Sequence, residues 1–118
     1  MIFLLTLACT NSLEIISQKE QYIVERSTEI FPLNEQFAFT FSLFDADREP
    51  IIPEDVLVDA EMPAHGHGMG QTPTVSNVDN VYTAEGMLFA MEGDWDIHIY
   101  MTQEGSVDQA TYSIVCCE

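Results

Sequence analysis

Strict alternation of side chains is the feature of this sequence that most restricts its fold. Every second residue is Phe or Leu in the segment 37–43, and every second residue is Trp, Ile or Met in the segment 95–101. Successive side chains of a β-strand point to opposite faces, so a period of two predicts strands with one buried face. Helical periodicity is hard to find, and the sequence therefore predicts an all-β protein.

Turn residues divide the alternating pattern into about seven predicted strands. These segments are Gln21–Arg26, Phe37–Leu43, Val56–Met62, Thr74–Val78, Tyr82–Met91, Trp95–Met101 and Val107–Val115. The segment 63–73 holds three glycines and two prolines and is expected to form a loop, and 103–106 a hairpin turn. A row of short strands of this kind predicts an immunoglobulin-like antiparallel β-sandwich with Trp95 in its core.

The charge of the chain excludes several classes of partner. Its 118 residues suit one domain, expected over 10–118, and they include 20 Asp and Glu but only 3 Lys and Arg. The formal net charge of -17 repels phosphate backbones and anionic lipid head groups. We therefore expect neither nucleic-acid binding nor membrane binding through a basic patch, whereas cations would gather near the surface.

The first residues resemble an export signal. An apolar run from Ile2 to Ala8 ends at Cys9, and the run is too short to span a bilayer as a helix. Residues 1–9 are expected to form a signal of the lipoprotein type, in which Cys9 becomes the lipidated first residue and anchors the protein in the bacterial cell envelope. The alternative is a first buried strand that contains a cysteine.

The other two cysteines, Cys116 and Cys117, are adjacent. Adjacent cysteines bridge each other only with strain, because disulfide geometry suits well-separated backbones. Free thiols, a strained pair and intermolecular links remain open, and the spacing is not that of a zinc site.

Two imidazoles and two thioethers lie within the eight residues from Met62 to Met69. They belong to Met62, His65, His67 and Met69, and the chain has only three histidines. Imidazole suits copper, and thioether sulfur favours Cu(I), so the cluster predicts a copper site. His65, His67 and Met69 would share one face of an extended segment. The residues that could complete the site are His98, Met91 and Met101.

The same residues also allow a purely structural interpretation. Met62 continues an inward-facing alternation and suits core packing. A histidine in a glycine-rich loop can bond to backbone carbonyls without any metal. Zinc fits less well than copper, because thioethers are poor zinc ligands and no cysteine lies near the cluster.

Two spaced motifs resemble the YtkA-like/FixH-like family of bacterial extracytoplasmic domains. They are the stretch 59–69 followed by Pro73, and Tyr82–Gly86 followed by Met91–Ile97, within residues 35–115. The resemblance implies an immunoglobulin-like sandwich, a shape also seen in copper-resistance proteins of the CopC type. It also implies copper handling outside the cytoplasm, since FixH-like proteins are associated with building copper-containing oxidases. Unlike FixH, this chain has no long transmembrane segment, and a lipid on Cys9 would replace it.

Two functions are therefore expected as alternatives. The first is an extracytoplasmic copper carrier or sequestration domain that uses the Met/His cluster. The second is a lipoprotein module that docks on a larger envelope complex through an exposed strand edge, without metal. An enzyme is not expected, because no nucleophile triad, P-loop or dinucleotide fingerprint occurs in the sequence.

Overall fold

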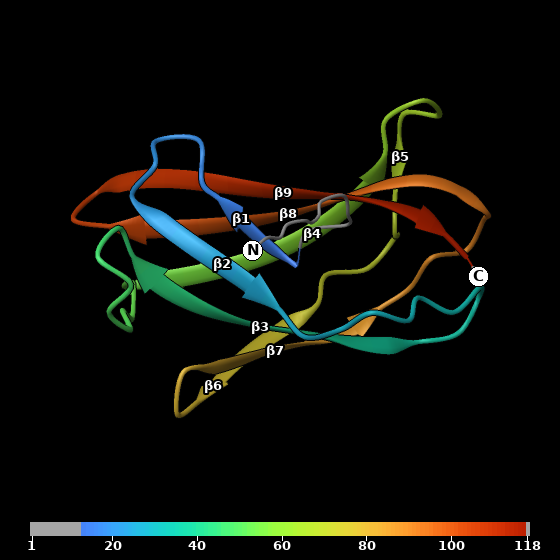
Figure 1. The fold of residues 1–118 in the computed structure, drawn as a ribbon. Coiled ribbons are helices and arrows are strands. Elements are labelled where there is room, and N and C mark those ends of the chain that lie inside the picture. Colours follow the sequence, from blue (N-terminus) through green and yellow to red (C-terminus); the bar gives the residue numbers. More distant parts are fainter. Residues whose placement is uncertain (1–12, 118) are drawn as a thin grey trace, which may run out of the picture.

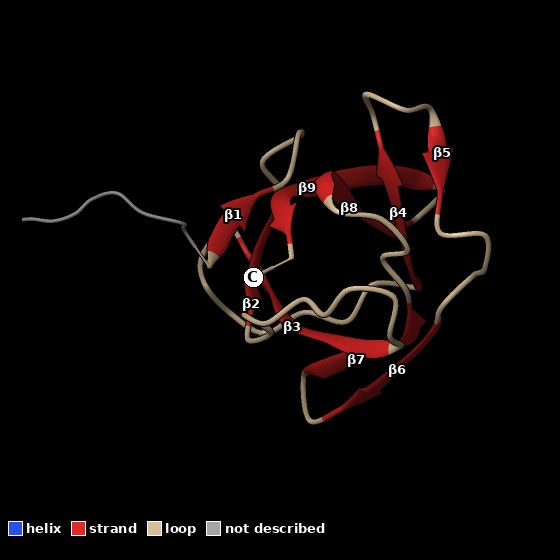
Figure 2. Ribbon diagram, turned by 90° about the vertical axis from the view of Figure 1, so that its right-hand side faces the viewer, coloured by secondary structure: helices blue, strands red, loops and turns tan. Residues whose placement is uncertain are grey.

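The computed structural model describes residues 13–117 and folds them into two antiparallel sheets (Figure 1). The first sheet has the order β1-β2-β3-β7-β6 and the second the order β5-β4-β8-β9. The strands are β1 (Glu14–Ile16), β2 (Tyr22–Arg26), β3 (Phe37–Asp45), β4 (Asp55–Met62), β5 (His67–Gly68), β6 (Thr74–Val78), β7 (Val81–Met87), β8 (Gly93–Gln103) and β9 (Ser106–Cys116). Figure 2 shows the two layers, with β4 and β8 above β7 and β6. The predicted all-β sandwich is confirmed.

All seven predicted strands are present, with shifts at their ends. β8 and β9 are joined by a hairpin at the predicted turn 103–106. Its residues Glu104 and Gly105 both have positive φ (53° and 78°). Asp79 and Asn80 do the same between β6 and β7, with φ of 52° and 64°. Two residues with φ above zero match the twist of a hairpin, so both turns set the register of their strands.

Two strands were not predicted, and one was predicted too long. β1 has only three residues, and β5 lies inside the segment 63–73 that was expected to be a loop. β7 ends at Met87 rather than Met91, because the chain then leaves the sheet and Phe89 forms an isolated parallel bridge with Leu33. Strands of two or three residues are too short to show an alternation, which is why the sequence did not reveal them.

The core lies between the two sheets and consists of the alternating apolar residues. Phe39 and Leu43 of β3 face Trp95 and Ile99 of β8, and all four are fully buried. Trp95 stacks on Phe89 with ring centroids 4.4 Å apart, which confirms its predicted place in the core.

One side of the sandwich is closed by bonds between the sheets. The Tyr112 hydroxyl in β9 donates to the carbonyl oxygens of Leu13 (2.8 Å) and Val24 (3.0 Å). The Gln18 amide donates to the Gln109 carbonyl at 2.8 Å, so the chain after β1 is tied to β9. These bonds replace the strand pairing that a closed barrel would supply on this side.

The three cysteines lie near the two ends of the chain. Cys9 lies outside the described residues. The sulfur atoms of the neighbouring Cys116 and Cys117 lie next to each other at the end of β9. No helix that could cross a membrane occurs within residues 13–117.

Candidate functional site

The Met/His cluster begins with a tight turn at the end of β4. The amides of His65 and Gly66 both donate to the Met62 carbonyl oxygen, at 3.0 and 2.9 Å. The chain then returns as β5, and His67 pairs with Met62 across the two strands. Paired residues of antiparallel strands point to the same face, so His67 lies on the inner side of the sheet at its rim.

The rings of His65 and His67 lie next to each other in solvent. Their centroids are 5.9 Å apart, their planes are inclined by 34°, and both residues are exposed. With a metal–nitrogen bond of about 2.0 Å and a ring radius of about 1.2 Å, two imidazoles on one ion have centroids up to about 6.4 Å apart. The observed separation is within this limit. Among residues 13–117, the one contact of a His67 ring nitrogen is a long 3.4 Å approach of Nδ1 to the Gly68 carbonyl oxygen.

Trp95 fixes the two segments that meet at this end of the sandwich. The His67 ring stands edge-on to the indole, with centroids 6.3 Å apart and planes at 77°. The indole Nε1–H donates to the Met91 carbonyl oxygen at 2.9 Å. Met91 is 42% exposed, so its thioether is accessible beside a loop that the indole holds in place.

Met62 and Met69 lie deeper than the histidines. Met62 is fully buried, which confirms its expected place in the core, and Met69 is 7% exposed. The Met69 sulfur accepts a hydrogen bond from the Leu88 amide at 3.4 Å, and this bond holds the chain after β7. Both thioethers thus pack the interior, whereas the two imidazoles face solvent.

Gly93 explains how the Met62 side chain fits. A Cβ atom at position 93 would lie 2.7 Å from Met62 Cε, and Gly93 has a φ of +138°, which L-residues rarely adopt. We expect Gly93→Ala to lower the free energy of unfolding by about 2 kcal/mol, through backbone strain and crowding. Gly105→Ala is the control, because its φ is also positive (+78°) but nothing lies within 4 Å of its Cβ position. Equal stabilities of Gly93→Ala and wild type in urea denaturation would contradict this account.

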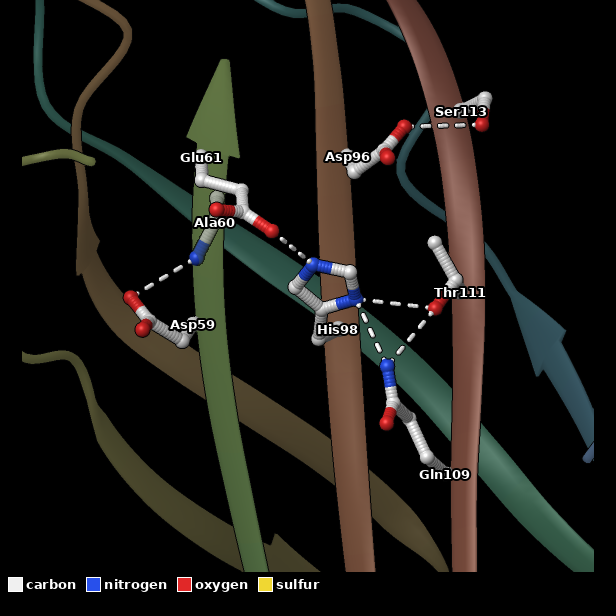
Figure 3. A network of polar contacts seen from close by, with 8 residues as sticks. All are labelled: Asp59, Ala60, Glu61, Asp96, His98, Gln109, Thr111 and Ser113. Carbon is white, nitrogen blue, oxygen red and sulfur yellow. Dashed lines mark hydrogen bonds and ion pairs between the residues drawn. The ribbon is translucent and has the colours of Figure 1, made fainter. Parts of the chain in front are cut away.

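His98 lies on the opposite face of the same sheet (Figure 3). Its Nε2 is 2.9 Å from Glu61 Oε2, and its Nδ1 lies 3.0 Å from Gln109 Nε2 and 2.9 Å from Thr111 Oγ1. The side-chain amide nitrogen of Gln109 can only donate, so Nδ1 of His98 accepts this bond. Nε2 then carries the ring proton and donates a hydrogen bond to the Glu61 carboxylate. Both ring nitrogens of His98 therefore have protein partners.

Met101 is also separate from the cluster. It is fully buried and pairs with Val56, six residues along β8 from Trp95, which is about 20 Å at strand spacing. The structure thus brings together the rings of His65 and His67, and the Trp95 indole contacts both the His67 ring and the backbone of Met91. The structure does not bring His98 or Met101 to them, because His98 projects from the outer face and Met101 lies toward the other end of the core.

The outer face around His98 is strongly acidic. Asp55, Asp59 and Glu61 project from β4, and Asp94 and Asp96 project from β8. Burial, followed by the charges of Asp59 and Glu61, raises the pKa of the neighbouring Tyr100 above its ordinary value. Within residues 13–117, no three His, Cys, Asp or Glu side chains gather in a way that could hold a metal ion. Within the described residues, His65 and His67 are the two imidazoles that the cluster presents side by side.

Comparison with known proteins places the chain in a family. No curated protein and no solved structure gives a significant match. The model of the YtkA-like family matches residues 18–100, which span both sheets and include the Met62–Met69 segment and Trp95. The match covers more than half of the sequence, and the chain belongs to the YtkA-like family.

Proposed function

We propose that this protein is an extracytoplasmic copper carrier or sequestration domain that binds one copper ion between His65 and His67. The observation that carries the proposal is the pair of exposed imidazoles with centroids 5.9 Å apart. Neutral imidazoles bind copper well, and Cu(I) accepts as few as two ligands. The resemblance to FixH-like proteins supports this proposal.

The surroundings favour a soft, singly charged ion. Met91 is 42% exposed, and its backbone carbonyl accepts a bond from the indole that contacts His67. Its thioether is the proposed sulfur ligand, and thioethers select for Cu(I). The net charge of -17 raises the concentration of cations at the surface without fixing them. Export to the cell envelope, with a lipid on Cys9 as the only membrane attachment, belongs to the same proposal.

Copper titration of histidine variants tests the proposal. The His65→Ala/His67→Ala variant should bind Cu(I) about 100-fold more weakly than wild type or not at all, because both nitrogen ligands are lost. Met91→Leu, which keeps the volume but removes the sulfur, should weaken Cu(I) more than Cu(II). Competition with a chromophoric chelator measures each affinity.

His98→Ala is the matched control for the loss of an imidazole. His98 lies on the opposite face with both nitrogens occupied, so its removal should leave copper affinity unchanged. Equal copper affinities of wild type and the double variant would overturn the proposal. A larger loss in His98→Ala than in the double variant would place the site on the outer face instead.

A further inference from the structure

The sandwich is closed along one side and open along the other. The chain around β1 is tied to β9 by the bonds of Gln18 and Tyr112. On the opposite side, β4 and β6 come near each other without pairing. The connection from β5 to β6 passes between the layers there, at the right of Figure 2.

Both strands along the open side have a free edge within residues 13–117. β4 pairs with β8 on one side, but on the other side only Glu61 and Met62 pair with β5. β6 pairs with β7 alone. The backbone of Asp55–Asp59 thus presents N–H and C=O groups that no strand in the described chain covers, and such an edge can accept another strand.

A cleft of about 190 Å³ lies between these two edges. Val56 and Asp55 line it from β4, Val75 and Asn77 from β6, and Tyr82 from β7. The exposed Ile52, 69% accessible, stands at its margin. The cleft therefore has both apolar and polar walls, and it lies directly beside the unpaired backbone of β4.

Tyr82 lines this cleft and carries a hydroxyl that has no protein partner within residues 13–117. Its side chain is 3% exposed and stacks on Phe41 with centroids 5.3 Å apart, but its hydroxyl oxygen is buried and has no hydrogen-bond partner. Burial, followed by the neighbouring Tyr22, raises the pKa of Tyr82, so the group stays a neutral O–H. Buried hydroxyls are nearly always bonded, so the Tyr82 hydroxyl adds a polar group to the wall of the cleft.

The outer face of β4 adds a pattern of charge. Asp55 and Asp59 are exposed on either side of Leu57, which is 55% exposed. A strand added to β4 would place every second side chain beside this row. Opposite charges next to Asp55 and Asp59, and an apolar side chain next to Leu57, would complement it.

We propose that this cleft is a docking site for an extended segment of another protein with basic, apolar and basic residues at alternate positions. The segment adds to β4 in line with β5 and covers the cleft. A second copy of this chain does not fit, because its 20 acidic residues oppose 3 basic ones. The site is independent of the His65 and His67 pair and of copper.

Synthetic peptides test the site directly. The capped peptide Thr-Lys-Val-Leu-Val-Lys-Thr should bind the full chain at concentrations below about 1 mM, and the same peptide with Glu in place of both Lys should not. Asp55→Asn/Asp59→Asn should weaken binding of the Lys peptide about tenfold. Asp94→Asn/Asp96→Asn, which removes two acids from the same face away from the edge, should have a much smaller effect.

Tyr82→Phe separates docking from a structural role. Removing an unpaired buried hydroxyl should raise the stability of the free protein and leave the affinity for the Lys peptide within about twofold, because the peptide binds the edge of β4 and not this buried group. Absence of Lys-peptide binding, equal binding of the Glu peptide, or an unchanged affinity in Asp55→Asn/Asp59→Asn overturns the proposal. Self-association through this edge in sedimentation would also overturn it, since the occupant would then be a second copy.

Discussion

Trp95→Ala should lower the free energy of unfolding by about 3–5 kcal/mol, as large aromatic truncations in cores do. Trp95 is fully buried and stacks on Phe89, so the variant leaves a cavity beside Phe89 where the indole was. It also leaves the Met91 carbonyl without its indole donor and removes the ring that His67 contacts. Because a domain of this size has only about 5–15 kcal/mol in total, we expect a visibly lower thermal midpoint or no folded protein.

Two variants keep this prediction testable if Trp95→Ala does not fold. Trp95→Phe retains an aromatic ring against Phe89 but loses the bond to Met91, so its loss should be about half as large. Val115→Ala truncates a residue that is 66% exposed and should change stability by less than about 0.5 kcal/mol. Guanidinium denaturation followed by circular dichroism gives all three values. Equal losses in Trp95→Phe and Val115→Ala would contradict the role assigned to the indole.

Asp108→Asn should destabilise the protein by about 2–3 kcal/mol, because a buried carboxylate loses hydrogen bonds made to its charge. Asp108 is 2% exposed. Its oxygens accept bonds from the Ser17 hydroxyl at 2.6 Å and from the amides of Lys19 and Gln109 at 2.9 and 2.8 Å. These bonds hold the turn after β1 against β9, so the closed side of the sandwich should loosen first.

The free energy of unfolding that Asp108→Asn loses relative to wild type should become smaller at low pH. Burial opposes ionisation of Asp108, but the bonds from Ser17, Lys19, Gln109 and Gln21 outweigh it and lower its pKa below the ordinary 3.8. A lowered folded pKa means that the stabilisation is complete above the unfolded pKa and is lost as the pH falls through the folded one. The difference between wild type and Asp108→Asn should therefore be constant at neutral pH and shrink below about pH 4.

The test compares the free energies of unfolding of wild type and Asp108→Asn at each pH, because the stability of wild type alone also reflects its other carboxylates. With a net charge of -17, mild acidification relieves repulsion among many carboxylates in both proteins. A double-mutant cycle combines Ser17→Ala with Asp108→Asn. The Ser17 hydroxyl donates to Asp108 and accepts a bond from the Tyr22 backbone amide at 3.0 Å, so the two losses should not be additive. Additive losses, or a difference that grows toward low pH, would contradict the network.

The alternation in the sequence was sufficient to predict the strands and the identity of the core. Side chains of a strand alternate by geometry, so the buried face of β3 or β8 can be read without knowing its neighbours. The same rule put Trp95 and Met62 inside, and it accounts for His98 and Met101 pointing to opposite faces of β8. Turn residues such as Glu104–Gly105 then marked where one strand ended and the next began.

The composition of the candidate site was visible in the sequence, but its membership was not. His65, His67, Met69 and His98 all carried suitable donor atoms. Pairing of β5 with β4 placed His67 on the inner rim and left His98 on the outer face. A contact between the His67 ring and Trp95, 28 residues later, has no local signal, because it depends on how the two strands register across the sheet.

The open edge of β4, the unpaired hydroxyl of Tyr82 and the buried Asp108 were decided by tertiary structure alone. Each of these features depends on which residues lie beside it in space. The sequence around them, an acidic strand, a tyrosine and an aspartate, carries no pattern that would predict those neighbours. Local backbone geometry determines which way a side chain points, so the alternating strands and the core followed from the sequence by itself. Which side chains meet depends on sheet order and register, and these arise only when strands distant in the chain pack together.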